Sequence, residues 1–169
     1  MEISGKLMKL YKGAVTPLVR AHLIKPFAKL LDKPNKIQEE TIDACCFFID
    51  VLENLDDEIF NEYYIPISKK FFQVWDENKN NEDRSLLQST GFGFGVIAQR
   101  APHSHYAHYG PDMLTRIVEL LVDPESSKDD HVYSYENCIS SLGKICYYHF
   151  DGVNVTKNTV QMFLEMLPL

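Results

Sequence analysis

The sequence predicts an all-α fold in which helix pairs repeat along the chain as an α-α superhelix, or solenoid. Two observations lead to this prediction: apolar residues recur with the period of a helix, and segments about 45 residues long resemble one another. With 169 residues, 45% of them hydrophobic, the chain has enough apolar side chains for one folded domain or one compact array.

The internal repeat appears first in three segments that end alike. Each is an apolar, helix-like run closed by an aspartate and a polar or proline-containing turn: IKPFAKLLDKPN, ISKKFFQVWDENK and LTRIVELLVDPES. The aspartates, Asp32, Asp76 and Asp123, lie 44 and 47 residues apart.

A second apolar run follows each of these turns: IDACCFFIDVLEN, STGFGFGVIAQR and CISSLGKICYY. The three runs align when Asp50, Gly95 and Gly143 are matched, at spacings of 45 and 48 residues. Two helices per unit with this period are typical of helical-repeat solenoids.

The region from Lys36 to Asn54 carries the helical pattern most clearly. One side of this helix is expected to face the core, with Ile37, Thr41, Cys45, Phe48, Ile49 and Leu52. Glu39, Asp43 and Asp50 fall on the opposite side, and the strict alternation of a strand is absent.

Prolines constrain the first helix of each pair. Pro26 and Pro66 lie inside predicted helices, where an isolated helix would kink or break. We expect neighbouring helices to hold such a kink in a packed array. Pro111 lies at a predicted helix start, a position that suits its fixed φ.

These patterns give a single array over residues 1–169, with about three helix pairs and a partial repeat at each end. The expected helices cover 5–11, 17–32, 36–54, 58–77, 82–100, 109–123, 131–148 and 155–167. The repeats are 17–54, 58–100 and 109–148, with a partial repeat over 155–169. Because both ends stop in mid-pattern without polar capping repeats, we expect a piece of a longer protein.

The stretch GFGFGVIAQR raises the question of a phosphate-binding loop. It contains neither GxxxxGK followed by Ser or Thr nor GxGxxG between a strand and a helix. We expect it instead to lie in the second helix of the middle pair. Glycine in a helix costs about 1 kcal/mol relative to alanine, and close helix–helix approach at Gly95 is the expected compensation.

Composition argues against several function classes. The net charge is −7 and no Lys/Arg cluster is present, which argues against nucleic-acid binding. No apolar run reaches membrane-spanning length, and the N-terminus has no signal-peptide core. The cysteines lie in apolar runs without a CxxC pair, as expected for reduced thiols of a cytosolic or nuclear protein.

No residue pattern supports a cofactor, metal or catalytic site. HSHYAHYG brings His103, His105 and His108 together, but we expect an inter-repeat loop there, because zinc sites normally need four placed ligands. No GxSxG elbow is present. Carboxylate pairs such as Asp56–Asp57 and Asp129–Asp130 are expected to cap helix starts. We therefore expect a binding protein and not an enzyme.

The candidate partner-binding residues are those that second helices would expose. They are Glu39, Asp43 and Asp50 in the first pair, the register-matched Arg84 and Gln88 in the second, and Glu136 and Ser140 in the third. If second helices line one face, these side chains form a strip whose carboxylates attract Lys/Arg-rich segments. The alternative is an ordinary solvated helix face.

The ordered series YENCISSLGKICYYHFDGVNV followed by MLPL resembles the importin-β (karyopherin-β) nuclear transport receptors, in particular the importin-five or karyopherin-β-three branch. GFGVIAQ and FFIDVLEN resemble the two preceding HEAT repeats, so the likeness runs from about Leu18 to Leu169. The region DRSLLQ departs from the usual arginine position at the start of a second helix, which argues against the regular Asp–Arg ladder of HEAT repeats.

This resemblance implies a HEAT-repeat solenoid and a non-enzymatic receptor that shuttles between cytoplasm and nucleus through the nuclear pore. It implies cargo with basic signals on the concave face, release by Ran-GTP, and FG nucleoporins on the convex face. All three partners would act through the full-length parent. The alternative is a generic HEAT-repeat interaction scaffold unrelated to nuclear transport.

Overall fold

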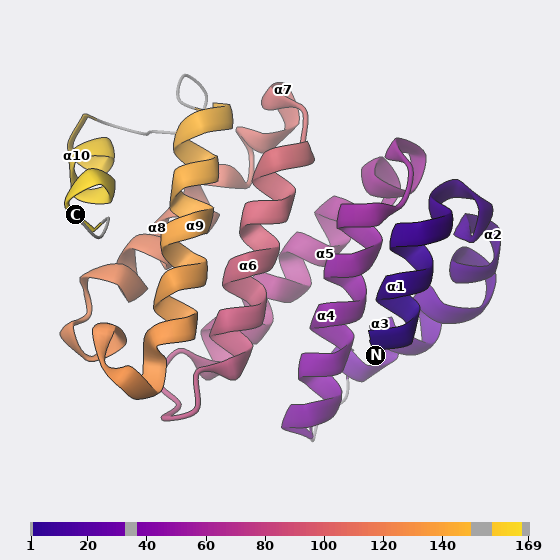
Figure 1. Ribbon diagram of the computed structural model, residues 1–169, viewed down its shortest axis with the longest axis horizontal. Helices are drawn as coiled ribbons and strands as arrows, with labels where there is room; N and C mark the ends of the chain where they lie inside the picture. Colours follow the sequence, from indigo (N-terminus) through magenta and orange to yellow (C-terminus); the bar gives the residue numbers. More distant parts are fainter. Residues whose placement is uncertain (1, 33–36, 150–156, 167–169) are drawn as a thin grey trace. The chain divides into compact units, whose positions relative to one another are not determined.

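The computed structural model describes residues 2–32, 37–149 and 157–166, and every regular element in these ranges is a helix (Figure 1). The all-α prediction is confirmed for this part of the chain. The α-helices are α1 Glu2–Tyr11, α2 Thr16–Leu18, α3 Ile24–Asp32, α4 Gln38–Asn54, α5 Asp57–Asn78, α6 Ser85–Arg100, α7 His103–Tyr106, α8 Gly110–Val122, α9 Val132–His149 and α10 Lys157–Met166. The predicted helix start at Lys36 and the ends of the partial repeat, 155–156 and 167–169, lie outside the described residues.

The chain divides into two compact units, Met1–Asn80 and Asn81–Leu169. The boundary falls in the turn DENKNNEDR, inside the expected repeat 58–100. Helix α5 therefore belongs to the first unit and α6 to the second. Among the described helices, none is long and apolar enough to cross a membrane.

In the first unit, α4 packs against α1, α3 and α5 (Figure 1). Thr41, Cys45, Phe48, Ile49 and Leu52 are buried, as predicted. Helix α4 also buries Ala44, Phe47 and Val51 completely, because other helices cover it on more than one side.

Ile37 is the exception on this helix. It is 58% exposed, so its predicted place in the core is wrong. The reason is local: Ile37 is the residue before α4 and has extended backbone angles, φ −81° and ψ 126°. A helix-period argument does not apply to a residue outside the helix.

The two interior prolines behave differently. Helix α5 runs through the exposed Pro66 without interruption, as expected for a helix held by its neighbours. Near Pro26 the chain is less regular, since a π-helical turn, Val19–Leu23, precedes α3. Pro111 lies in the first turn of α8, as predicted.

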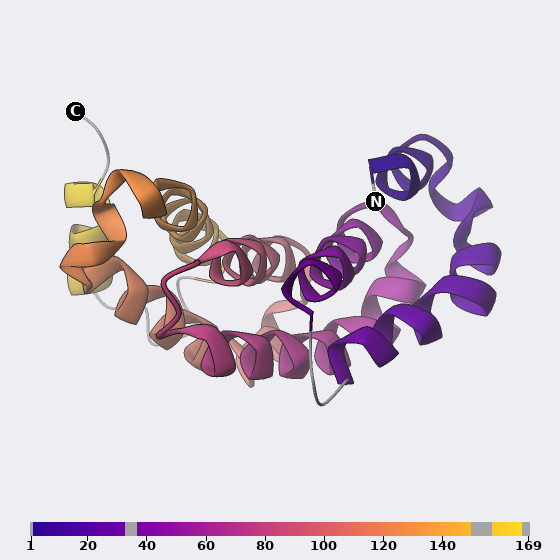
Figure 2. The same ribbon diagram turned by 90° about the horizontal axis from the view of Figure 1, so that it is seen from below.

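In the second unit, α9 packs along α6 and also contacts α8 (Figure 2). GFGFGVIAQR lies inside α6, so the helical interpretation of this stretch is confirmed. Ser141 of α9 donates a hydrogen bond from Oγ to the Gly91 carbonyl at 2.8 Å. A Cβ built on Gly95 would lie 2.4 Å from that Oγ and 3.2 Å from the Ser141 Cα. The expected close approach at Gly95 is therefore present.

In the second unit, three short elements were not expected from the sequence. They are α7 and the 3-10 turns Pro124–Ser127 and Asp129–His131. Each is a single turn within a segment expected to be a loop, too short to show a helical period.

The long-range hydrogen bonds of side chains within each unit roughly follow the spacing of the internal repeat. They join residues 38–51 positions apart, such as Thr16 to Asp56 in the first unit and Ser141 to Gly91 in the second. Side chains one repeat apart are thus neighbours, which is compatible with a repeat-like helical array.

We expect Gly95→Ala to destabilise the second unit by about 1–3 kcal/mol and Gly95→Leu to destabilise it more, because the added atoms overlap Ser141. Urea unfolding followed by circular dichroism measures the difference. Gly13→Ala is the matched control, since its Cβ would meet only Asp56 Oδ2 at 3.7 Å. Equal unfolding midpoints for Gly95→Ala and Gly13→Ala would contradict the packing role.

Candidate functional site

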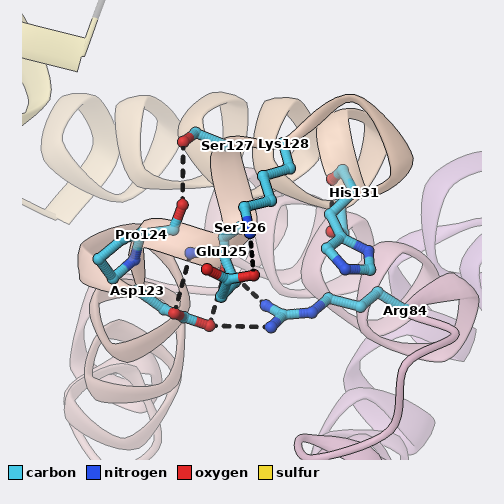
Figure 3. A network of polar contacts seen from close by, with 9 residues as sticks. Arg84, Asp123, Pro124, Glu125, Ser126, Ser127, Lys128 and His131 are labelled. Atoms are coloured by element: carbon cyan, nitrogen blue, oxygen red, sulfur yellow. Dashed lines mark hydrogen bonds and ion pairs between the residues drawn. The ribbon is translucent and has the colours of Figure 1, made fainter.

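Arg84, the residue before α6, joins the start of α6 to the end of α8 (Figure 3). Its Nη2 donates to Asp123 Oδ2 at 2.8 Å, and its Nη1 donates to Ser126 Oγ. Asp123 also accepts the backbone N–H of Glu125 at 3.1 Å and so caps the turn Pro124–Ser127. This network fixes the loop between α8 and α9 against α6.

The Arg84–Asp123 pair bears on one expectation. DRSLLQ argued against a regular Asp–Arg ladder, and an arginine at the start of α6 pairs with the aspartate after α8. One such pair is not a ladder, so that expectation stays a prediction. The side chain of Arg84 is only 13% exposed, so the pair is partly shielded from water. The Arg84 guanidinium, followed by the Glu125 N–H, lowers the pKa of the Asp123 carboxyl.

Beside this network lies a cleft of about 430 Å³ between the starts of α6 and α9. It is lined by Glu82, Asp83, Arg84, Ser85, Gln88, Asp130, His131, Tyr133 and Ser134. We call it the α6–α9 cleft.

The α6–α9 cleft is acidic and has an aromatic residue in its wall. Glu82, Asp83 and Asp130 are exposed carboxylates, while the charge of Arg84 is offset by Asp123. Tyr133 is 68% exposed, so its ring is open to a partner. Carboxylates beside an exposed aromatic ring favour a cationic group over an anionic one.

The sequence-predicted residues of the second unit fall into two groups. Arg84 and Gln88 line the α6–α9 cleft. Glu136 and Ser140 are exposed on α9 but lie outside the cleft lining. The two helices meet here, since Asn137 Nδ2 donates to the Gln88 carbonyl at 3.3 Å.

In the first unit, Glu39 and Asp43 are exposed on α4, as expected. Asp50 is not: it is half-buried against α1, where a Cβ on Gly5 would lie 2.4 Å from its Oδ2. Its predicted exposure is wrong because α1 covers this end of α4. Burial, and then the nearby charge of Glu53, raise the pKa of the Asp50 carboxyl. The continuity of one strip from α4 to α6 and α9 stays a prediction.

The histidines of HSHYAHYG do not gather around a common point. Three or more metal-ligating side chains do not cluster anywhere in the part of the chain that the structure describes. His103 instead pairs with His149, which sequence reasoning missed. Their separation of 46 residues, close to the repeat period, was the available signal.

The remaining predictions concern the cysteines and the carboxylates expected to cap helix starts. Cys45 is buried, as expected, Cys46 is half-buried, and none of Cys45, Cys46, Cys138 and Cys146 forms a disulfide. Asp56 caps α5 by accepting the Ile59 N–H at 3.1 Å. The cap prediction is wrong for Asp129 and Asp130, because within the described residues neither accepts a capping hydrogen bond. A 3-10 turn begins at Asp129 itself and places both residues in its first turn.

The chain matches no protein-family model. The α6–α9 cleft is therefore interpreted from its own geometry. Sequence reasoning found Arg84 and Gln88 but missed Asp130, His131 and Tyr133, which reach the cleft from the loop before α9 and its first turn. Turn residues of this kind carry no periodic signal.

We expect Asp123→Asn to destabilise the protein by about 1 kcal/mol, since the asparagine keeps an acceptor for Glu125 but loses the charge opposite Arg84. The pKa of Asp123 is depressed in the folded state, so its contribution is present above the ordinary value of 3.8 and is lost as pH falls below it. Unfolding free energies of both proteins, measured from pH 7 to pH 2.5, should therefore converge in acid. A constant difference would contradict the charge-pair explanation.

Proposed function

We propose that this chain is part of a nuclear import receptor of the importin-β type, in which paired helices present a binding surface for other proteins. The observation that carries the proposal is the α6–α9 cleft, with its exposed carboxylates and Tyr133. The ordered series of residues that resembles the importin-five branch supports the same proposal. The receptor would act in the cytoplasm and the nucleus.

The mechanism is non-covalent. A basic segment of a cargo protein approaches the negative surface, and Glu82, Asp83 and Asp130 raise its rate of association. A lysine or arginine of that segment then lies over the Tyr133 ring. Ran-GTP, acting on the full-length receptor, shifts its curvature or competes for its inner face and releases the cargo. FG nucleoporins bind elsewhere on the same receptor.

The second candidate is a HEAT-repeat scaffold with a permanent partner and no role in transport. The closely packed helices α6 and α9 and the acidic cleft suit such a scaffold equally well. The two candidates differ in their response to Ran, because only a transport receptor distinguishes the GTP-bound from the GDP-bound form.

The first test is a pull-down of the full-length parent protein with Ran locked in the GTP form and with Ran loaded with GDP. We expect retention of the GTP form alone. Equal retention of both forms, or of neither, would contradict the transport proposal and leave the scaffold.

The second test concerns the cleft. We expect Glu82→Gln combined with Asp130→Asn to weaken binding of an arginine- and lysine-rich peptide about three- to tenfold, since each exposed charge contributes up to about 1 kcal/mol. Fluorescence anisotropy at two salt concentrations measures the affinity, and the loss should shrink at higher salt. Glu119→Gln is the control, because this exposed carboxylate of α8 lies outside the cleft lining. An equal loss in the control would show that only net charge matters.

A further inference from the structure

A buried histidine at the C-terminal end of α9 ties three helices of the second unit together. His149 is only 2% exposed. Its Nε2 lies 2.6 Å from the Ala98 carbonyl oxygen of α6, and its Nδ1 lies 3.2 Å from His103 Nδ1 of α7. The Tyr106 ring of α7 stacks on its imidazole, with ring centroids 3.8 Å apart.

These contacts fix where the protons sit. A carbonyl oxygen only accepts, so His149 Nε2 must carry the hydrogen that points to Ala98. In the neutral ring, His149 Nδ1 is then an acceptor, and His103 Nδ1 must donate to it. His103 itself is exposed on α7.

A proton on His149 has the opposite effect. It would occupy Nδ1, so the hydrogen bond from His103 Nδ1 would be lost. Two N–H donors would face each other across 3.2 Å unless a neutral His103 moved its hydrogen to Nε2 and became the acceptor. The buried ring would also carry a positive charge without a nearby compensating carboxylate among its described neighbours, which are Ala98, His103 and Tyr106. Charging a buried group without a counter-charge is unfavourable.

The electrostatics of the surrounding groups agree with a neutral His149. Burial, aided by the charge of His103, lowers the pKa of His149, although the Ala98 hydrogen bond opposes the shift. On α9 itself, burial raises the pKa of the Cys146 thiol. Burial also raises the pKa of the Tyr106 hydroxyl. The charge that the Cys146 thiol would carry if ionised in turn contributes to raising the pKa of Tyr106. Both groups therefore stay uncharged in the acid range where His149 titrates.

We propose that α7 is a pH-released flap, which neutral His149 holds against α6 and α9 and which protonation of His149 sets free. The flap is small, a single turn from His103 to Tyr106, so its release leaves the α6–α9 contact at Gly95 and Ser141 intact. Release exposes Tyr106, which is 1% exposed when docked. The flap does not depend on the proposed transport function, since its groups lie outside the α6–α9 cleft lining.

The direction of the pH dependence follows from the lowered pKa. The docked state binds protons at His149 more weakly than the released state, whose histidine titrates near its ordinary value of 6.5. Docking is therefore fully favoured above about pH 6.5 and weakens as pH falls below it, by up to about tenfold per pH unit until the docked-state pKa is reached.

Hydrogen exchange of the segment 103–109 tests the flap in the intact chain. Its amide protection factors, corrected for the intrinsic pH dependence of exchange, should fall about tenfold or more between pH 7.5 and pH 5, while those of Gly91–Gly95 stay constant. Protection that does not change with pH in this segment would overturn the proposal without any variant.

Two histidine substitutions assign the effect. His149→Gln removes the titrating group, so its 103–109 protection should lose the pH dependence. His108→Gln removes an exposed histidine of the same segment and should behave like the wild type. If His149→Gln fails to fold, an NMR titration of the wild-type imidazole replaces it, and its midpoint should coincide with that of the α7 amides. A different midpoint, or an unchanged pH dependence in His149→Gln, would overturn the assignment to His149.

Discussion

The close approach of α6 and α9 is the constraint on which the second unit depends. Gly95 has no Cβ, so the backbone of α9 at Ser141 can come near enough for its hydroxyl to reach the Gly91 carbonyl at 2.8 Å. A neutral hydrogen bond contributes only about 1 kcal/mol, so the larger gain is the apolar surface that close helices bury. The glycines reduce intrinsic helix stability, and packing offsets that loss.

This contact also sets the register of the two helices. Gln88 meets Asn137 near their starts, Gly91 meets Ser141 in the middle, and Ala98 meets His149 at their ends, so α6 and α9 run parallel. The α6–α9 cleft and the paired histidines His103 and His149 consequently lie at opposite ends of this helix pair. Both ends depend on the register of α6 against α9, although neither contains Gly95.

The repeat period made much of this arrangement predictable from the sequence. It indicated which helices exist, and the helical periodicity identified most of the buried face of α4. The exposure of Ile37 and the burial of Asp50 were not predicted, because each depends on the surroundings of α4. Ile37 lies before the first turn of the helix, and Asp50 is covered by α1. A helical wheel separates the apolar side of a helix from its polar side. In a layered array, however, a neighbouring helix can pack against the polar side and bury it.

The contacts of the site that were not predicted from the sequence were missed for one physical reason. Asp123 and His149 act through side chains that meet partners roughly one repeat away, a relation that does not appear in a local pattern. The repeat itself supplies the missing relation, since Arg84 and Asp123 lie 39 residues apart and His103 and His149 lie 46 apart. In a repeat protein, contacts can therefore be predicted between polar residues that lie one period apart in the sequence, because the stacking of repeats makes them neighbours. Applied to Arg84, that rule places its guanidinium against the α8–α9 loop, and the acidic cleft then follows from the carboxylates that lie beside it.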